Sequence, residues 1–200
     1  MGSIPTPATI KYKNVEITLK IVIEAVYFML PAYAANALPV IFNNYNFLPS
    51  FARPVDFNAR LFGKPVFGHS KTFRGFAAGI SGALIIGLIQ NFLYSIQDIK
   101  DVSLIEYSLL NAILISFLLG FGALLGDLVK SFFKRRIGIS SGKPWVIFDQ
   151  TDYAIGALAL ASIIIIPSLT HIIVIITISA LFSIMANIIA YLSGIKKVWW

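Results

Sequence analysis

Five long apolar segments dominate this sequence, and they restrict the folds open to it. They cover roughly residues 17–42, 73–94, 102–126, 145–166 and 169–193. A helix needs about 20 mostly apolar residues to cross the hydrocarbon core of a bilayer, and each segment is that long. Only 12% of the residues are charged, against about a quarter in soluble domains. We therefore expect an all-α integral membrane protein in which residues 1–200 form one transmembrane domain with five transmembrane helices.

Prolines and small residues add detail to these spans. Pro31 and Pro39 are expected to kink the first helix, and Pro167 to end the fourth before the tight turn at 166–171. Two pairs of small residues four positions apart predict close contacts between helices; they are Ala78 with Gly82, and Gly122 with Gly126.

Basic residues predict the orientation. With five spans the termini lie on opposite sides, and Lys and Arg collect on the cytoplasmic side. Twelve fall on one side: Arg53, Arg60, Lys64, Lys71, Arg74, Lys130, Lys134, Arg135, Arg136, Lys143, Lys196 and Lys197. Four fall on the other: Lys11, Lys13, Lys20 and Lys100. We therefore expect two basic cytoplasmic loops, the N-terminus outside, the C-terminus inside, and Trp199 and Trp200 at the inner interface.

The segment 126–152 holds 8 of the 25 charged residues. If the third helix continues past Gly126, then Asp127, Lys130 and Lys134 share one face, because they are spaced i, i+3 and i+7. A carboxylate between two ammonium groups suits a divalent metal held by the acid and phosphate held by the lysines. The alternative is a basic collar at the membrane surface, which fits Arg136 better than Asp127.

Two further acids open the fourth span. Asp149 and Asp152 lie three apart in FDQTD, so both project to the same side of a helix. The helix dipole favours acids there, but by only about 0.3–1 kcal/mol. Placing a carboxylate in a span costs about 2.5 kcal/mol or more. A metal role is the better explanation, since Mg²⁺ takes one or two carboxylates together with water and phosphate oxygens.

The loop FGKPVFGHSKTFRG, residues 62–75, alternates glycines with the cations Lys64, Lys71 and Arg74. It predicts a flexible backbone cradle for phosphate, although it lacks the GxxxxGK[ST] pattern of a P-loop. A net charge of +7 also suits nucleic acid. However, the basic residues gather at one membrane face, which favours an anionic substrate at the membrane surface. We therefore expect no nucleic-acid partner.

These motifs together resemble a known family. GDLVKSFFKRRIGI, GKPW and FDQTDYAIGA, with PSFARPVDFNARLFGK and FGKPVFGHSKTFRG upstream, are similar to the archaeal CDP-archaeol synthases, membrane relatives of the bacterial CTP:phosphatidate cytidylyltransferases. The bacterial signature Ser-x-x-Lys-Arg matches Ser131, Lys134 and Arg135. Its Asp-Arg-x-Asp matches 149–152, with Gln150 in place of Arg. Its Lys-Asp pair and its His-Gly-Gly are absent, which favours the archaeal branch.

The resemblance implies a Mg²⁺-dependent transfer of CMP from CTP to an isoprenoid glyceryl ether lipid phosphate, 2,3-di-O-geranylgeranylglyceryl phosphate, within a cell membrane and facing the cytoplasm. We expect Asp127, Asp149 and Asp152 to bind the metal and, with Lys134, to form the catalytic set. We expect Lys130, Lys134 and Arg135 to neutralise pyrophosphate. The remaining expected contacts to nucleotide or lipid phosphate are Lys64, Lys71, Arg74 and Ser131.

Two other functions remain open at this point. A transporter of an anionic metabolite would place ionisable groups near mid-membrane and show repeated halves, and neither pattern is evident. A CDP-alcohol phosphotransferase would carry a longer acidic motif, of which only Asp149-x-x-Asp152 is present.

Overall fold

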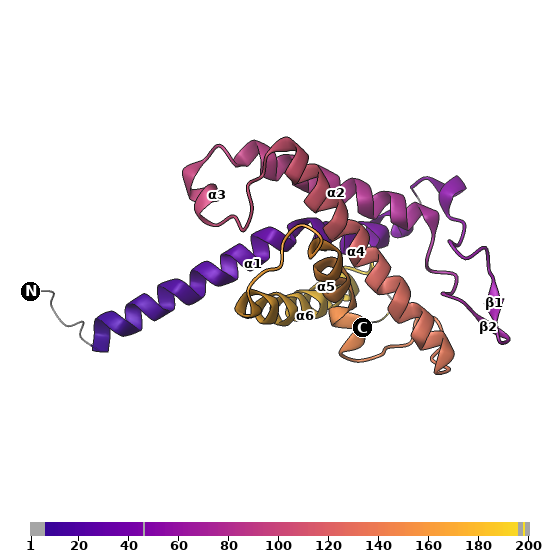
Figure 1. Ribbon diagram of the computed structural model, residues 1–200. Helices are drawn as coiled ribbons and strands as arrows, with labels where there is room; N and C mark the ends of the chain where they lie inside the picture. The colour runs from indigo at the N-terminus through magenta and orange to yellow at the C-terminus, as the bar shows by residue number, and fades with distance from the viewer. Residues whose placement is uncertain (1–6, 46, 196–197, 199–200) are drawn as a thin grey trace, which may run out of the picture.

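The structure, a computed structural model, describes residues 7–45, 47–195 and 198 of the chain. Lys196, Lys197, Trp199 and Trp200 therefore lie outside the described residues. The described part is almost wholly helical (Figure 1). Its elements are α1 (Pro7–Asn44), η1 (Pro49–Phe51), β1 (Arg60–Leu61), β2 (Lys64–Pro65), α2 (Phe73–Leu93), α3 (Gln97–Asp101), α4 (Leu109–Arg136), α5 (Phe148–Ala161) and α6 (Leu169–Leu192).

Within the described residues, four helices are long and apolar enough to cross a membrane: Val15–Asn44, Phe73–Leu93, Leu109–Arg136 and Leu169–Leu192. The fifth predicted span, 145–166, is helical only over the 14 residues of α5. At 1.5 Å per residue α5 is about 21 Å long, shorter than a hydrocarbon core of about 30 Å. The all-α membrane fold is thus confirmed, while five crossings stay a prediction.

The helix that carries the acidic and basic face is longer than the sequence pattern required. α4 starts at Leu109 because Ser108 caps it, its side chain accepting a hydrogen bond from the Asn111 amide. The predicted start at 102 was therefore wrong: residues 102–108 form no helix, and residues 97–101 form the separate short helix α3. At its other end α4 continues past Gly126 to Arg136, as the charge spacing predicted.

Small residues let the helices approach closely. A β-carbon built on Gly122 would lie 2.4 Å from the carbonyl oxygen of Gly156 in α5, and one on Gly82 would lie 2.1 Å from the side chain of Leu38 in α1. The buried core is correspondingly rich in alanine. These contacts confirm the predicted small-residue interfaces, which rely on van der Waals contact because lipid supplies no hydrophobic force between helices.

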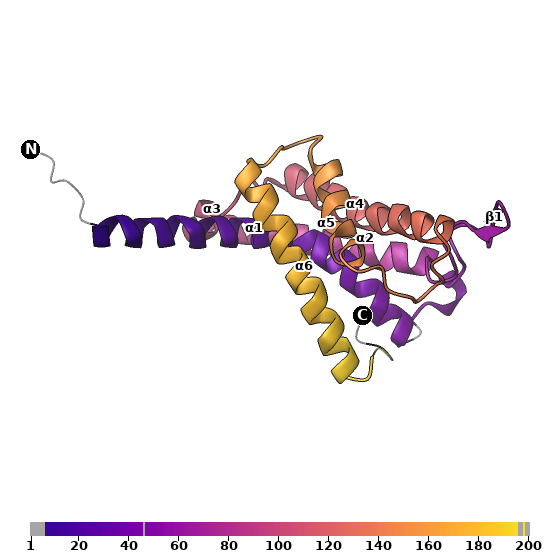
Figure 2. The same cartoon turned by 90° about the horizontal axis from the view of Figure 1, so that it is seen from below.

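α6 is joined to α1 by polar contacts and then diverges from it. The His171 ring lies 2.9 Å from a Glu24 oxygen, and the Tyr33 hydroxyl lies 3.1 Å from Oγ of Ser179. Beyond these contacts α6 runs away from the rest of the bundle (Figure 2). α1 contains both Pro31 and Pro39, and it changes direction along its length in the same view. The C-terminal halves of α1 and α6 therefore stand apart.

The β1–β2 hairpin projects from the end of the molecule where α4 finishes (Figures 1 and 2). Arg136 holds it there, since its guanidinium donates to the carbonyl oxygens of Leu61, at 2.6 Å, and of Pro65. In return, the Lys64 ammonium donates to the Arg136 carbonyl oxygen at 2.9 Å. The long loop between α1 and α2 is thereby attached to the last turn of α4.

Candidate active site

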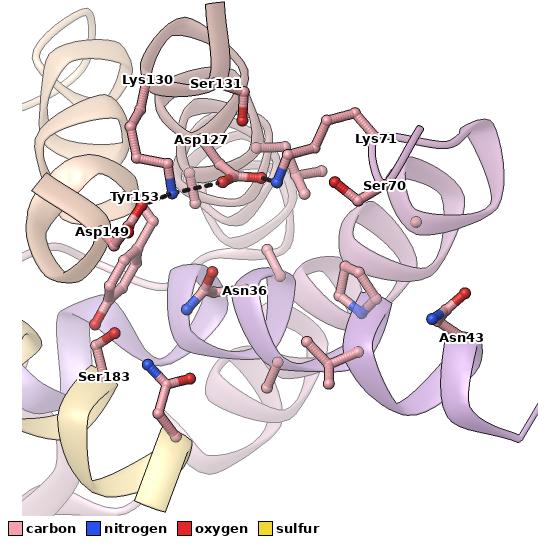
Figure 3. Close-up of a pocket in the computed structure, with 18 of the residues that line it drawn as sticks. Asn36, Asn43, Ser70, Lys71, Asp127, Lys130, Ser131, Asp149, Tyr153 and Ser183 are labelled. Carbon is pink, nitrogen blue, oxygen red and sulfur yellow. Dashed lines mark hydrogen bonds and ion pairs between the residues drawn. The ribbon is translucent and has the colours of Figure 1, made fainter. Parts of the chain in front are cut away.

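Three aspartates from two helices surround one ammonium group. Nζ of Lys130 lies 3.0 Å from Oδ1 of Asp127, 3.1 Å from Oδ1 of Asp149 and 2.8 Å from Oδ2 of Asp152. All four side chains are mostly buried, and Asp152 is only 7% exposed. Figure 3 shows Lys130 and Asp127 linked above the pocket. The predicted convergence of the acids is therefore present, and a lysine ammonium lies at its centre.

A second lysine of α4 reaches Asp149. Nζ of Lys134 lies 3.0 Å from both oxygens of Asp149 and donates to the carbonyl oxygen of Lys143 at 2.6 Å. Oδ2 of Asp149 also accepts the Trp145 amide at 2.5 Å. Asp149 thus closes the turn that starts α5 and ties it to α4. This turn is strained at Ile147, whose φ is 73°, a conformation that β-branched residues rarely adopt.

The third cation comes from the long loop. The Lys71 ammonium forms an ion pair with Oδ2 of Asp127. Two contacts place it: the Val55 amide donates to the Lys71 carbonyl oxygen at 2.8 Å, and Thr72 caps α2 through the Gly75 amide. Asp56 shapes the same loop by accepting the Phe67 amide at 2.9 Å. Lys71 is thus positioned by a backbone contact distant in sequence, to Val55, and by the cap of the helix that follows it.

This network forms one side of a cavity of about 880 Å³. The polar side carries Lys71, Asp127, Lys130, Lys134 and Asp149, together with Ser131 and Arg135. The opposite side is formed by the C-terminal halves of α1 and α6, including Val40, Phe182, Ala186 and Ala190. Figure 3 shows Asn36 of α1 pointing from this side toward the ion network. One cavity therefore joins a charged surface to an apolar one.

The predicted phosphate contacts divide into two groups. Ser131 and Arg135 are buried and line the cavity, and Nε of Arg135 has no hydrogen-bond partner among the described residues. Lys64 and Arg74 lie outside the cavity lining. Lys64 contacts Arg136, and Arg74 donates to the Asn43 side chain at 2.7 Å. Nucleotide contacts by these two residues stay predictions, and their observed contacts connect structural elements.

The three aspartates are also a candidate metal site. In the part of the chain that the structure describes, no three His, Cys, Asp or Glu side chains are arranged to hold an ion directly. Each aspartate oxygen lies about 3 Å from the ammonium instead, whereas Mg²⁺–oxygen distances are about 2.0–2.1 Å. The chemistry of the donor set still fits Mg²⁺, since three carboxylate oxygens face the one point that the Lys130 ammonium occupies.

Sequence reasoning missed several cavity residues. Asn36, Tyr153 and Ser183 line the cavity, yet they belong to apolar segments without a recognisable motif. The available signal was polarity itself, because a polar side chain within a span is costly unless it meets a partner or a cavity. Tyr153 illustrates a structural role: its hydroxyl donates to the Ser179 carbonyl oxygen at 2.7 Å and fixes α5 against α6.

The fold and site together define an α-helical membrane protein with a charged cavity at one end of its helices. A similar solved structure is described as an intramembrane enzyme for archaeal membrane lipid biosynthesis. It aligns with a TM-score of 0.68 and 30% sequence identity, over 84% of this chain and 94% of that one. The two proteins are therefore similar in amino-acid sequence as well as in the arrangement of their helices.

Comparison with proteins of similar sequence identifies the family. The CDP-archaeol synthase of Methanocaldococcus jannaschii is 35% identical over 182 residues, 90% of this chain and 98% of that protein. That of Thermococcus onnurineus is 37% identical over 187 residues, covering 92% and 99%. The profile of the CarS-like CDP-archaeol synthases matches residues 18–200. The chain belongs to the CDP-archaeol synthase family, as its motifs predicted.

Proposed function

We propose that this protein is a multi-pass membrane cytidylyltransferase that transfers CMP from CTP to an isoprenoid glyceryl ether lipid phosphate. The products are CDP-archaeol, in its unsaturated form, and pyrophosphate. Family membership supports this reaction. The observation that carries it is the cavity in which the lysines and aspartates of α4 and α5 face the apolar sides of α1 and α6. Such a cavity suits a reaction between a soluble polyanion and a lipid.

The bond changes require little covalent help from the protein. An oxygen of the lipid phosphate attacks the α-phosphorus of CTP, a new P–O–P bond forms, and the bond to the β-phosphate oxygen breaks. The attacking phosphate is already ionised at neutral pH, so no strong general base is needed. Positioning and neutralisation of charge then supply most of the catalysis.

The cations of the cavity suit the neutralising role. Lys134 and Arg135 occupy neighbouring positions near the end of α4, and both line the cavity. We assign them to the pyrophosphate leaving group, together with Lys130. Lys71 approaches the same network from the loop before α2, and we assign it to the phosphates of either substrate. Ser131, one turn from Asp127 on α4, would donate its hydroxyl to a phosphate oxygen.

The three aspartates are the proposed metal ligands. Asp127, Asp149 and Asp152 would hold Mg²⁺, since their oxygens face one point and their chemistry fits a hard divalent cation. When bound, Mg²⁺ would neutralise charge on the triphosphate and orient it for in-line displacement. The protein's part is to keep the three carboxylates together on two rigid helices.

The apolar side of the cavity would receive the lipid. Val40 of α1 and Ala186 of α6 lie on facing helices that stand apart at this end. Isoprenoid chains could lie between these helices while the phosphate reaches the lysines. Asn36 is placed between the two environments (Figure 3), so its amide can contact the glycerol or the phosphate of the lipid.

We also propose the orientation inferred from the basic residues. The N-terminus lies outside, the chain crosses five times with α5 and its flanking residues forming the fourth crossing, and the cavity faces the cytoplasm. The positions of the basic loops support this, because the hairpin, the end of α4 and the start of α5 form one end of the molecule.

The experiment is a direct assay of the purified protein. CTP labelled at the α-phosphate is supplied with a geranylgeranyl ether lipid phosphate and Mg²⁺, and the lipid fraction is analysed for a labelled CDP-lipid. We expect labelled product with CTP, and much less with UTP, ATP or GTP. Failure to transfer label from CTP to any isoprenoid lipid phosphate would contradict the proposal, as would equal product from all four nucleotides.

A further inference from the structure

Lys130 has a position unlike that of the other two lysines in the network. Its ammonium lies 2.8–3.1 Å from an oxygen of each of Asp127, Asp149 and Asp152. By contrast, Lys71 forms an ion pair with Asp127 alone and Lys134 with Asp149 alone. Lys130 is therefore the one ammonium, among the described residues, that contacts all three acids.

This contact has a consequence for stability. Asp127 and Asp149 line the cavity and Asp152 lies behind them, outside its lining. Three carboxylates this close repel one another strongly, because the surroundings are poorly polarisable. Lys130 relieves that repulsion from within the group, and its side chain is only 13% exposed. A buried charge of this kind needs partners on every side, and the three aspartates provide them. The lysine and the acids thus stabilise one another.

The same position excludes a second cation. Any ion bound to the same three aspartate oxygens would lie within about 3 Å of the Lys130 nitrogen, where like charges repel. A lysine is well suited to withdraw, since its compact ammonium sits on a flexible four-carbon stem. The ion pairs of Lys130 and the binding of a divalent ion are therefore mutually exclusive at these oxygens.

We propose that Lys130 is an exchangeable internal counter-ion for the three aspartates. It holds them together until Mg²⁺ binds, and it is then displaced toward the phosphates of the nucleotide. The inference rests on the proposed role of the aspartates as Mg²⁺ ligands. Lys130 acts in it as a positioning residue, which sets how tightly the divalent ion binds.

The test is thermal unfolding of the purified protein during titration with Mg²⁺ alone, after treatment with EDTA. The variant is Lys130→Met, and the matched control is Lys134→Met. Lys134 lies one turn further along α4, and of the three aspartates it contacts Asp149 alone. We expect Lys130→Met to unfold at a lower temperature in EDTA. We expect its half-maximal stabilisation at a Mg²⁺ concentration at least tenfold lower than that of the wild type, with less than a threefold shift for Lys134→Met.

A second measurement uses the wild-type protein and covers the case in which Lys130→Met does not fold. Lysine acetylation is followed by mass spectrometry, with and without Mg²⁺. We expect the acetylation rate of Lys130 to rise several-fold with Mg²⁺, because the displaced ammonium is no longer held by three carboxylates. An unchanged or lower rate would overturn the proposal.

These measurements distinguish failure of the counter-ion role from failure of the metal site. If Mg²⁺ stabilises the wild type and Lys130→Met at the same concentration, the metal site stands and the counter-ion role is wrong. If Mg²⁺ stabilises none of the proteins, even with CTP present, the aspartates are not the metal ligands, and both the metal assignment and the counter-ion role fail. A CTP-dependent transfer activity measured in parallel shows whether the proposed reaction survives either result.

Discussion

Gly126 of α4 lies directly against the backbone of Asp152 in α5. A β-carbon built on Gly126 would be 2.2 Å from the Asp152 carbonyl oxygen and 3.2 Å from Cα of Gly156. Gly126 precedes Asp127, so the closest approach of the two helices adjoins the acids that they carry. The absence of a side chain at position 126 is therefore what allows Asp127 and Asp152 to share the Lys130 ammonium.

Gly126→Ala should accordingly damage both stability and activity. The added methyl group has backbone on its far side and must push α5 away, which costs about 1–3 kcal/mol in a packed interior. We expect a lower unfolding temperature and at least a tenfold loss of kcat. Gly75→Ala is the matched control, since a β-carbon there meets atoms only at 3.4 Å and beyond. Wild-type activity in Gly126→Ala would contradict the close-contact argument.

Asp149→Asn tests the acid that binds both lysines of α4. The side-chain oxygen of the new asparagine can still accept hydrogen bonds from the Trp145 backbone N–H and the Lys134 ammonium. The fold should therefore survive with a modest fall in unfolding temperature. The lost charge should reduce kcat at least 100-fold, because Lys130, Lys134 and the proposed Mg²⁺ would all lose the carboxylate that they share. The control is Asp98→Asn, an exposed acid in α3 at the other end of the bundle. A variant with more than a tenth of wild-type kcat would remove Asp149 from the catalytic set.

Asn36→Leu tests the polar side chain on the lipid side of the cavity. Leucine has the same branched shape as asparagine but cannot donate a hydrogen bond, and position 36 is exposed, so packing on α1 should be kept. We expect the KM for lipid phosphate to rise about 5–50-fold, the KM for CTP to change less than threefold, and the unfolding temperature to be unchanged. Asn36→Gln should recover part of the lost affinity. A rise confined to the KM for CTP would place Asn36 at the nucleotide instead.

Lys64→Met and Arg136→Met separate a structural contact from a nucleotide contact. Lys64 donates to the Arg136 carbonyl oxygen outside the cavity lining, so Lys64→Met should leave the KM for CTP within threefold. Arg136→Met removes the guanidinium that holds the β1–β2 hairpin. It should increase protease cleavage between residues 57 and 66 about tenfold. A large rise in the KM for CTP in Lys64→Met would restore its predicted role as a phosphate ligand.

The chain contains no cysteine, which makes its orientation easy to test. Phe62→Cys places a thiol at the hairpin tip, where the native side chain is 88% exposed, and Asp98→Cys places one in α3. A membrane-impermeant maleimide applied to intact cells should label Asp98→Cys and spare Phe62→Cys. Permeabilised cells should show labelling of both. Labelling of Phe62→Cys in intact cells would reverse the proposed orientation.

Much of this architecture follows from the sequence because lipid imposes simple rules. Long apolar runs must be helices, so three of the four spanning helices among the described residues were located within a few residues. The exception in length was α4, whose start at Leu109 depended on Ser108 capping and not on hydropathy. The acidic and basic face of α4 was also predictable, because helical geometry alone places Asp127, Lys130 and Lys134 on one side.

The tertiary structure decided which groups meet. Sequence spacing could not show that Lys71 of the loop reaches Asp127 while Lys64 and Arg74 make structural contacts, because the loop conformation is set by distant partners such as Asp56 and Arg136. It could not place Lys130 among three aspartates either, since that depends on how closely α5 packs against Gly126. Local periodicity determines the faces of helices, whereas the contacts between those faces depend on packing that no single segment encodes.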